Sequence, residues 1–244
     1  MALAGFGDRV EGFHAVAAAA AAGRVEQLWV DRGRLRRIEY QTVVDNVLAD
    51  GGKVSEIDDV ISLAETTAPQ GLVARCSPRK EVTLNELASG DEPAAVMVLD
   101  HVVDPHNIGA IARSVAAAGL SGLVLASRRA APLSAAAFKS AAGSLETVAI
   151  SRVNSIPEAI SRLRRLGLWS VGLDQGADQL LWRLPLLTEA VALVVGDEGS
   201  GLSQLVSDRI EVRVRIPISA AVESLNASVA AALAAFEVSR VRNN

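Results

Sequence analysis

Cysteine and aromatic residues are scarce in this chain, and long uncharged apolar runs are missing. The single cysteine, Cys76, excludes an intramolecular disulfide and fits a reducing cytoplasm. Aromatic residues make up only 3% of the 244 residues, so Ala, Val, Leu and Ile must fill the core. No apolar run reaches the roughly 18 residues that a transmembrane helix needs. We therefore expect a cytoplasmic globular protein with no membrane partner.

Basic residues are also fewer than acidic ones, with 24 Lys and Arg against 28 Asp and Glu. The net charge is −4, which weighs against a nucleic-acid partner because nucleic-acid footprints are usually basic. Arginines nevertheless cluster at 32–37 and at 128–129, in or next to turn-like segments where side chains can reach a phosphate. Each cluster alone is most often a solvated face. The arginines that we expect to contact RNA are Arg34, Arg36, Arg37 and Arg128.

The order of the predicted elements indicates an α/β protein with two units. In the first unit, residues 5–76, we expect helices at 11–22 and 35–49, strands at 25–30, 54–57 and 71–76, and a helix capped by Asp58. Residues 77–93 are rich in proline and charge and poor in apolar residues, which predicts a linker. The second unit comprises residues 94–244.

The second unit has the stronger strand signals. Several of its apolar runs are continuous, as expected of buried parallel strands. The strands are predicted at 95–99, 122–125, 147–150, 168–173, 191–195 and 211–216. The helices are predicted at 107–118, 134–142, 156–166, 202–207 and 225–240.

The segment after the strand at 95–99 carries polar residues on a predicted helix. Asp104 before Pro105 is a typical helix start, and Gly109 would let a neighbouring backbone approach closely. Asn107 and Arg113 lie off the apolar stripe of this helix. Arg113 could bind a phosphate or act on a hydroxyl beside it, although a surface arginine on an amphipathic helix would look the same.

Two further segments follow the last two strands. Residues 196–202 have their glycines as G-x-x-G-x-G, and they lack both the dinucleotide order and the Lys-Ser/Thr ending of a phosphate loop. Glu198 in this segment could accept hydrogen bonds from a ligand. After the last strand, Pro217 removes a backbone donor, and Ser224 or Asn226 could cap the final helix. The spacing of His101, Asp104 and His106 fits no standard metal site, so we expect no metal.

Together the three segments resemble motifs 1, 2 and 3 of the SpoU/TrmH family of RNA ribose 2′-O-methyltransferases. Residues 104–114 match D-P-x-N-x-G-x-I-x-R-[ST], and residues 196–201 match G-x-E-x-x-G. Residues 216–228 match I-P-M followed by S-L-N-x-S, with Ile218 in place of the methionine and Ala220 where a glycine is common. Residues 11–16 are similar to the start of the ribosomal-protein-like RNA-binding domain that many members carry.

The resemblance implies a parallel-sheet domain with a deep trefoil knot, which no sequence pattern would predict because knots are nearly absent from proteins. It implies S-adenosylmethionine as methyl donor without a metal, and a homodimer formed through the C-terminal domain, for which Val229, Ala232, Leu233 and Phe236 offer an apolar face. The residues expected around the target ribose are Asn107, Arg113, Glu198 and Asn226. The residues expected at the cofactor are Gly196, Gly201, Ile216, Ser224 and Leu225.

The function that follows from this resemblance is transfer of a methyl group to a ribose 2′-hydroxyl. A guanosine of large-subunit rRNA is the first expectation for the substrate, and tRNA is the second. A catalytically silent RNA-binding or ribosome-assembly protein is the alternative from another class, and it is disfavoured because the motif polar residues are all present. An ordinary nucleotide-dependent α/β enzyme comes third, since the common nucleotide fingerprints are absent. Whether Arg113 takes the hydroxyl proton or positions a phosphate stays open.

Overall fold

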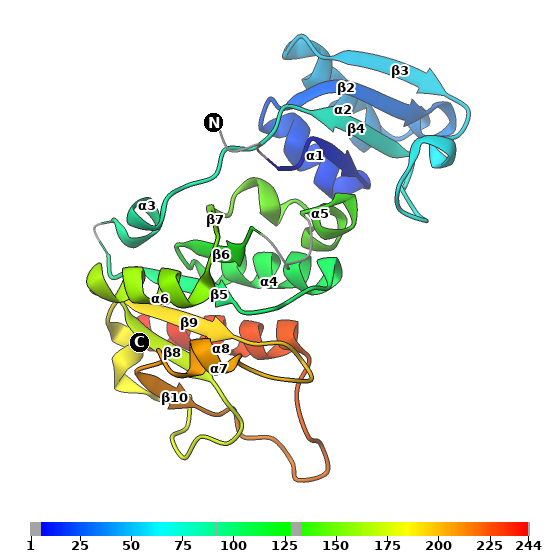
Figure 1. Cartoon of the computed structure of the whole chain (residues 1–244). Helices are drawn as coiled ribbons and strands as arrows, with labels where there is room; N and C mark the ends of the chain where they lie inside the picture. Colours follow the sequence, from blue (N-terminus) through cyan, green and yellow to red (C-terminus); the bar gives the residue numbers. More distant parts are fainter. Residues whose placement is uncertain (1–5, 91, 128–132, 244) are drawn as a thin grey trace.

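Two β-sheets organise the computed structural model, which describes residues 6–90, 92–127 and 133–243. Strands β1 to β4 form a four-stranded sheet in the order β1-β4-β2-β3, and the remaining strands form a six-stranded sheet in the order β10-β8-β9-β5-β6-β7. The smaller sheet belongs to the N-terminal unit. This unit packs against helix α5, which lies beside the larger sheet (Figure 1). None of the helices in the described part of the chain has the length and apolar character needed to cross a lipid bilayer.

The N-terminal unit is a mixed sheet with helices packed on it. Strand β4 pairs antiparallel with β1 and β2, and β3 pairs parallel with β2. Cys76 at the end of β4 is 2% exposed, and burial raises the pKa of its thiol to about 12. The elements are β1 (Arg9–Glu11), α1 (Phe13–Ala21), β2 (Val25–Asp31), η1 (Arg32–Arg36), α2 (Ile38–Ala49), β3 (Lys53–Ile57), η2 (Ile61–Leu63) and β4 (Leu72–Cys76).

The C-terminal unit is a wholly parallel sheet, as the sequence predicted. Alternate residues of β5 point to opposite faces: Met97 belongs to the cluster packed with α4 and α8, and Val98 to the cluster packed with α6. The elements are α3 (Leu84–Ala88), β5 (Ala95–Leu99), α4 (Pro105–Ala118), β6 (Gly122–Ala126), α5 (Ala135–Ala141), η3 (Ser144–Glu146), β7 (Ile150–Val153), α6 (Ile156–Arg165), β8 (Trp169–Leu173), η4 (Pro185–Thr188), β9 (Val191–Val195), α7 (Gln204–Ser207), β10 (Val212–Val214) and α8 (Ala227–Arg242).

The predicted start of the first helix was wrong. Glu11 ends β1, and Gly12 follows with a φ of 90°, which an L side chain rarely adopts, so α1 begins only at Phe13. The buried Glu11 carboxylate accepts hydrogen bonds from the backbone N–H groups of Glu65 and Thr66 at 2.6 and 2.9 Å. Burial alone would raise the pKa of Glu11, but these bonds together with those from the Thr66 hydroxyl and Arg9 hold that pKa below its usual value.

The helix predicted at 35–49 is two elements. The five-residue 3-10 turn η1 comes first, and Arg37 in an extended conformation separates it from α2. Ile38, the first residue of α2, is 74% exposed although it is apolar. Asp58 caps no helix, because the next element is the short turn η2, and its carboxylate instead accepts a hydrogen bond from Arg32 at 2.7 Å.

Strand β7 lies three residues later than the predicted strand at 147–150. The earlier residues continue the turn η3, because Gly143 has a φ of 94° and the Thr147 hydroxyl donates to the Ser144 carbonyl at 3.0 Å. The strand itself contains Ser151 and Arg152, whose polar side chains interrupt the apolar pattern that predicts a buried strand. Strand β10 is likewise shorter than predicted, and it ends at Val214.

The segment predicted as a linker contains a helix that packs on the C-terminal unit. Thr83 and Glu86 form a reciprocal capping box at the start of α3, and Leu87 within α3 is 2% exposed. The Val82 N–H donates to the Ile150 carbonyl at 2.9 Å. The boundaries of the two domains, at 5–76 and 94–244, stay a prediction.

The junction between the two units is tightly packed. A Cβ on Gly7 would lie 2.3 Å from the ring of Phe138 in α5, so only glycine fits there. Arg24, just before β2, pairs with Glu146 of η3 at 2.5 Å, and the Glu146 side chain is 3% exposed. The same buried apolar cluster continues from the N-terminal sheet through Phe138 to α4 and α8. Apolar packing and a buried ion pair therefore join the two units.

Candidate functional site

Two of the three motif segments leave the sheet side by side. Strands β5 and β9 are neighbours, with Leu99 opposite Val195, and the Asp100 N–H donates to the Val195 carbonyl at 2.9 Å. The segment that leads into α4 and the glycine loop at 196–202 therefore begin at adjacent points on the carboxyl edge of the sheet. Ligands of parallel α/β sheets bind at this edge.

The glycine loop folds back on itself. The Asp197 N–H donates to the Gly201 carbonyl at 3.1 Å, and the Gly201 N–H donates to the Asp197 carbonyl at 3.0 Å. A Cβ on Gly196 would lie 2.2 Å from the carbonyl carbon and oxygen of Gly201. No side chain can be accommodated at Gly196 unless this backbone moves.

A cavity of about 330 Å³, here called the strand-end cavity, lies where β8, β9 and β10 end. All of the residues expected at the cofactor line it, and these are Gly196, Gly201, Ile216, Ser224 and Leu225. Four carboxylates also line it: Asp174, Asp197, Glu198 and Glu223. The stretch from Leu173 to Gln175 also forms part of its wall; it belongs to no motif and was not predicted. Its position at the end of a third neighbouring parallel strand was the available signal.

Three of the residues expected at the ribose form one hydrogen-bonded group, here called the amide–carboxylate cluster: Asn107, Glu198 and Asn226. The Asn107 amide donates to Glu198 Oε1 at 2.7 Å, and the Asn226 amide donates to the same oxygen and to Asn107 Oδ1, the latter at 3.1 Å. Asn226 Oδ1 accepts from the Ser228 and Val229 N–H groups, so Asn226 also caps α8. Glu198 belongs both to this cluster and to the wall of the strand-end cavity.

Helix α4 carries Asn107 and is positioned by local sequence. Asp104 Oδ1 accepts from the His106 N–H at 2.9 Å, and Pro105 occupies the first turn. Gly109 brings α4 against α5, since a Cβ there would lie 2.4 Å from the Ala137 carbonyl oxygen. Arg113 lies on the exposed side of the same helix, and among the described residues it has no hydrogen-bond or ion-pair partner. The structure thus does not bring Arg113 into the amide–carboxylate cluster.

Asp100 is a polar residue of this region whose role the sequence analysis did not foresee. It is 1% exposed, and its carboxylate accepts from the Ser203 N–H at 2.7 Å and contacts the His101 ring nitrogen Nδ1 at 2.7 Å. These bonds tie the end of β5 to the end of the glycine loop. Within the described ranges, no group of three or more His, Cys, Asp or Glu side chains is placed to hold a metal ion.

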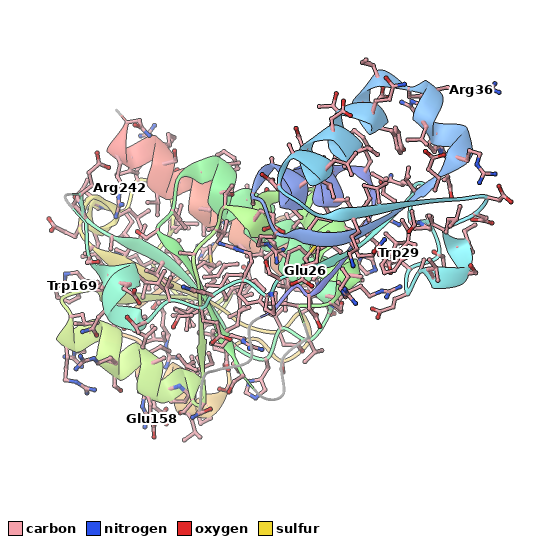
Figure 2. The ribbon with its side chains drawn as sticks, turned by 90° about the horizontal axis from the view of Figure 1, so that it is seen from above. Glu26, Trp29, Arg36, Glu158, Trp169 and Arg242 are labelled. Carbon is pink, nitrogen blue, oxygen red and sulfur yellow. The ribbon has the colours of Figure 1, made fainter. Side chains whose placement is uncertain are left out.

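A second cavity, of about 440 Å³, lies in the N-terminal unit and is here called the arginine cavity. It is lined by Phe13, His14, Arg34, Arg37, Glu39, Tyr40 and Gln70. Two of the arginines expected to contact RNA therefore meet there. Arg36 does not: it lies at the end of the N-terminal unit far from the larger sheet and points outward (Figure 2). Arg128 lies outside the described residues.

Comparison with protein families gives matches over nearly the whole chain. The family model described as SpoU rRNA Methylase family matches residues 94–236. A second one, described as RNA 2'-O ribose methyltransferase substrate binding, matches residues 9–82.

Individual relatives agree with the family matches. A 23S rRNA (guanosine-2'-O-)-methyltransferase of Escherichia coli K12 is 33% identical over 97% of this chain and 99% of its own length. An uncharacterized tRNA/rRNA methyltransferase of Synechocystis is 34% identical over 96% of this chain, which spans 63% of that protein. The crystal structure of the SpoU methyltransferase AviRb from Streptomyces viridochromogenes, in complex with AdoMet, superposes with a TM-score of 0.79 at 27% identity, covering 97% of this chain and 90% of that one.

Proposed function

Because this chain belongs to the SpoU rRNA methylase family, we propose that it transfers a methyl group from S-adenosylmethionine to a ribose 2′-hydroxyl of RNA. The observation that carries this proposal is the position of Glu198, which lines the strand-end cavity and holds both amides of the amide–carboxylate cluster. The proposed target is a guanosine of large-subunit rRNA, because the Escherichia coli relative, which matches over nearly its full length, is named for that reaction. Such a reaction would take place in the cytoplasm.

The strand-end cavity suits a positively charged methyl donor. Asp174, Asp197 and Glu223 line it beside Glu198, and a cation is stabilised by nearby carboxylates. The close contact of Gly196 with Gly201 leaves backbone rather than side chain at this wall. The AviRb structure, which aligns over most of the chain, was solved with AdoMet. When bound, this molecule supplies an electrophilic methyl carbon on a sulfonium, which needs no metal for activation.

The amide–carboxylate cluster suits a ribose hydroxyl. The three hydrogen bonds that Glu198 accepts from Asn107, Asn226 and the Ala227 N–H all fall on Oε1. Oε2 is therefore available to accept from a sugar hydroxyl. Holding the hydroxyl in one orientation contributes to catalysis by reducing the entropy that the reaction step must lose.

Arg113 is proposed to act at the same ribose through the RNA. Its guanidinium is exposed and has no anionic partner among the described residues, so it is available to a phosphate, which guanidinium binds well. Acting as the proton acceptor is the alternative role. Arg113→Lys retains the positive charge but loses the planar guanidinium. If Arg113 acted only through its charge, this variant would keep its activity.

The experiment that tests the proposed function combines binding with mapping. Calorimetry with S-adenosylmethionine in the presence of a chelator should give heat of binding, and mapping of 2′-O-methyl groups in RNA from a deletion strain should show one lost site in large-subunit rRNA. Loss of a tRNA methyl group instead would favour tRNA, a substrate that the Synechocystis relative's name includes. No cofactor heat and no lost methyl group would favour a catalytically silent RNA-binding protein.

A homodimer is proposed for the C-terminal unit. Val229, Leu233 and Phe236 on α8 are 46%, 37% and 50% exposed, while the opposite face of α8 packs into the core. Large apolar side chains exposed along one helix face are typical of an interface. Light scattering at micromolar concentration should give the mass of a dimer, and a species of monomer mass alone would contradict this.

The deep trefoil knot is proposed for the same unit. The chain leaves β10 at one edge of the sheet and returns as α8, which packs against β5 and β9 in its middle. Figure 1 shows this return through the long loop between β10 and α8. An experimental structure that traces the backbone through residues 174–242 tests whether the chain is knotted. A backbone path that contains no knot would contradict the proposal.

A further inference from the structure

The arginine cavity is built around the single tyrosine of the chain. The Tyr40 ring is buried, at 4% exposure, and the guanidinium groups of Arg34 and Arg37 lie 6.0 and 5.4 Å from its centroid. Phe13 packs against the same ring at 4.9 Å, and His14 meets Phe13 edge to face at 5.3 Å. A buried aromatic ring thus supports two exposed planar cations.

Gln70 fixes the floor of this cavity. Its carbonyl accepts the Tyr40 hydroxyl at 2.8 Å, and its side-chain Oε1 accepts the Phe13 N–H at 3.0 Å. Gln70 has a φ of 56°, which is rare for a residue other than glycine, and the bonds on both its backbone and side chain hold it there. The cavity is therefore held in shape before any ligand arrives, which reduces the entropic cost of binding.

The cations of the cavity are only partly neutralised. Arg37 forms an ion pair with Glu39, whereas Arg34 has no carboxylate partner in the part of the chain that the structure describes. Arg32, just outside the cavity, is paired with Asp58 at 2.7 Å and is close to Glu56. Within the cavity, the unpaired positive charge is therefore at Arg34, beside the exposed His14 ring.

We propose that the arginine cavity binds one unpaired nucleotide of the RNA, with its base stacked on a guanidinium face and its phosphate contacted by Arg34. This inference rests on the proposed function, since it names the part of the protein that holds the RNA away from the target ribose. Unpaired bases in RNA stack on aromatic rings and on arginine planes. A simple anion would need the charge but not a tyrosine and a phenylalanine behind it. A cavity of about 440 Å³ gives room for a base as well as a phosphate.

The test compares neighbouring arginines. Binding of a fluorescent, unstructured oligoribonucleotide to the full chain is measured by anisotropy for Arg34→Ala, Arg37→Ala and the matched control Arg36→Ala. The cavity variants should bind about tenfold more weakly, because a stacked base contributes that much or more. Each lost phosphate contact should also lower the salt slope by about 0.7. The sequence grouped Arg36 with the RNA contacts, but it lies outside the arginine cavity, so the affinity of Arg36→Ala should stay within a factor of about two of wild type. Equal losses in all three variants, or none, would overturn the site.

Two further measurements separate a nucleotide from charge alone. Arg37→Lys should keep the salt slope but lose affinity, because the planar face is gone, and wild-type affinity would overturn stacking. Polyphosphate, which has no bases, should compete more weakly than the oligoribonucleotide at equal charge, and equal competition would show that only an anion is bound. Thermal unfolding of every variant checks that the losses do not come from a damaged fold.

Photo-crosslinking with a 4-thiouridine oligonucleotide gives the direct readout. Cross-links should map to Phe13 or His14, because Tyr40 is buried, and cross-links confined to other segments would overturn the site. Failure of this inference is distinguishable from failure of the proposed function. A chain that transfers methyl groups but shows no effect of the cavity variants holds its RNA elsewhere. A wild-type chain that binds no RNA overturns both.

Discussion

The strand-end cavity is lined by Asp174, Asp197, Glu198 and Glu223, and none of the described residues in its wall is basic. The arginine cavity has two arginines and a histidine against one glutamate. The two surfaces therefore attract ligands of opposite charge, which agrees with the proposed binding of a cationic methyl donor at one and of an RNA polyanion at the other. A net charge of −4 averages over both and describes neither.

The two regions also differ in how their polar groups are held. In the amide–carboxylate cluster the side chains bond to one another, and Asn226 at the same time caps α8. In the arginine cavity the cations rest on rings, and Arg34 has no carboxylate partner among the described residues. Fixed hydrogen bonds suit the exact placement of a reacting hydroxyl. Stacked cations suit a ligand that contributes its own negative charge.

A large effect on turnover is expected from Arg113→Ala, which tests whether the chemical step can be separated from cofactor binding. Turnover should fall by at least about 100-fold, by analogy with removal of a general base, and S-adenosylmethionine affinity should stay nearly unchanged because Arg113 lies outside the strand-end cavity. A tritiated-methyl transfer assay and calorimetry measure the two quantities. Lysine should not restore turnover, and the exposed helix arginine Arg165→Ala serves as control. Full turnover of Arg113→Ala would remove its role.

Glu146→Gln tests the connection between the two regions. It leaves Arg24, whose side chain is 11% exposed, without its charged partner. Breaking a buried pair costs about 3–5 kcal/mol of the free energy of unfolding, which urea denaturation would detect. Glu158→Gln is the control, because Glu158 is exposed on α6 at the outer edge of the larger unit (Figure 2) and should change stability by about 0.5 kcal/mol or less. Equal effects of both changes would mean that the junction contributes little.

Gly196→Ala tests the strand-end cavity alone. The new Cβ would lie 2.2 Å from the Gly201 backbone, so the loop must move, and overpacking of this kind corresponds to about 100-fold in S-adenosylmethionine affinity. Gly199→Ala is a matched control for overpacking: Gly199 also lines the cavity, but the nearest heavy atom to its new Cβ would be 3.8 Å away. RNA binding at the arginine cavity should be preserved in both variants. Unchanged cofactor affinity in Gly196→Ala would contradict the proposed use of this cavity.

Phe236→Asp gives the smallest of these effects and tests whether the α8 face pairs two copies. Placing a charge in a buried interface should weaken dimerisation by about 30-fold, the size of an ordinary hot spot. Sedimentation over a range of concentrations measures it. Ile61→Asp, in η2 of the N-terminal unit at 59% exposure, is the control. If both variants behave as the parent protein does, this α8 face is not the interface.

Much of the parallel sheet could be predicted because its strands, such as Val191–Val195, are continuous apolar runs. The bounds of strand β7 could not, since its polar Arg152 is stabilised there by a tertiary contact, the bond to Glu81 at 2.6 Å. The motifs predicted that Asn107, Glu198 and Asn226 lie around one site, and in the structure they are in hydrogen-bond contact. Their roles stay a prediction.

The arginine cavity shows what the sequence could not supply. Arg34, Arg36 and Arg37 look equivalent along the chain, but after folding as a 3-10 turn followed by one extended residue only Arg34 and Arg37 line the cavity. Phe13 and Gln70 come from segments far apart in sequence, so no local pattern joins them to Tyr40. The one available signal was the scarcity of aromatic residues, which makes the position of the single tyrosine informative.

The packed junction of Gly7 against Phe138, with its buried ion pair, has a consequence for substrate choice. Because the two units cannot swing freely, the span between the arginine cavity and the strand-end cavity is set by the fold. A folded RNA that holds an unpaired nucleotide at that distance from the target ribose can bind both cavities at little entropic cost. A flexible single strand must first be ordered, which costs entropy. The protein would then select RNA by the distance between an unpaired nucleotide and the target ribose, before it recognises any base.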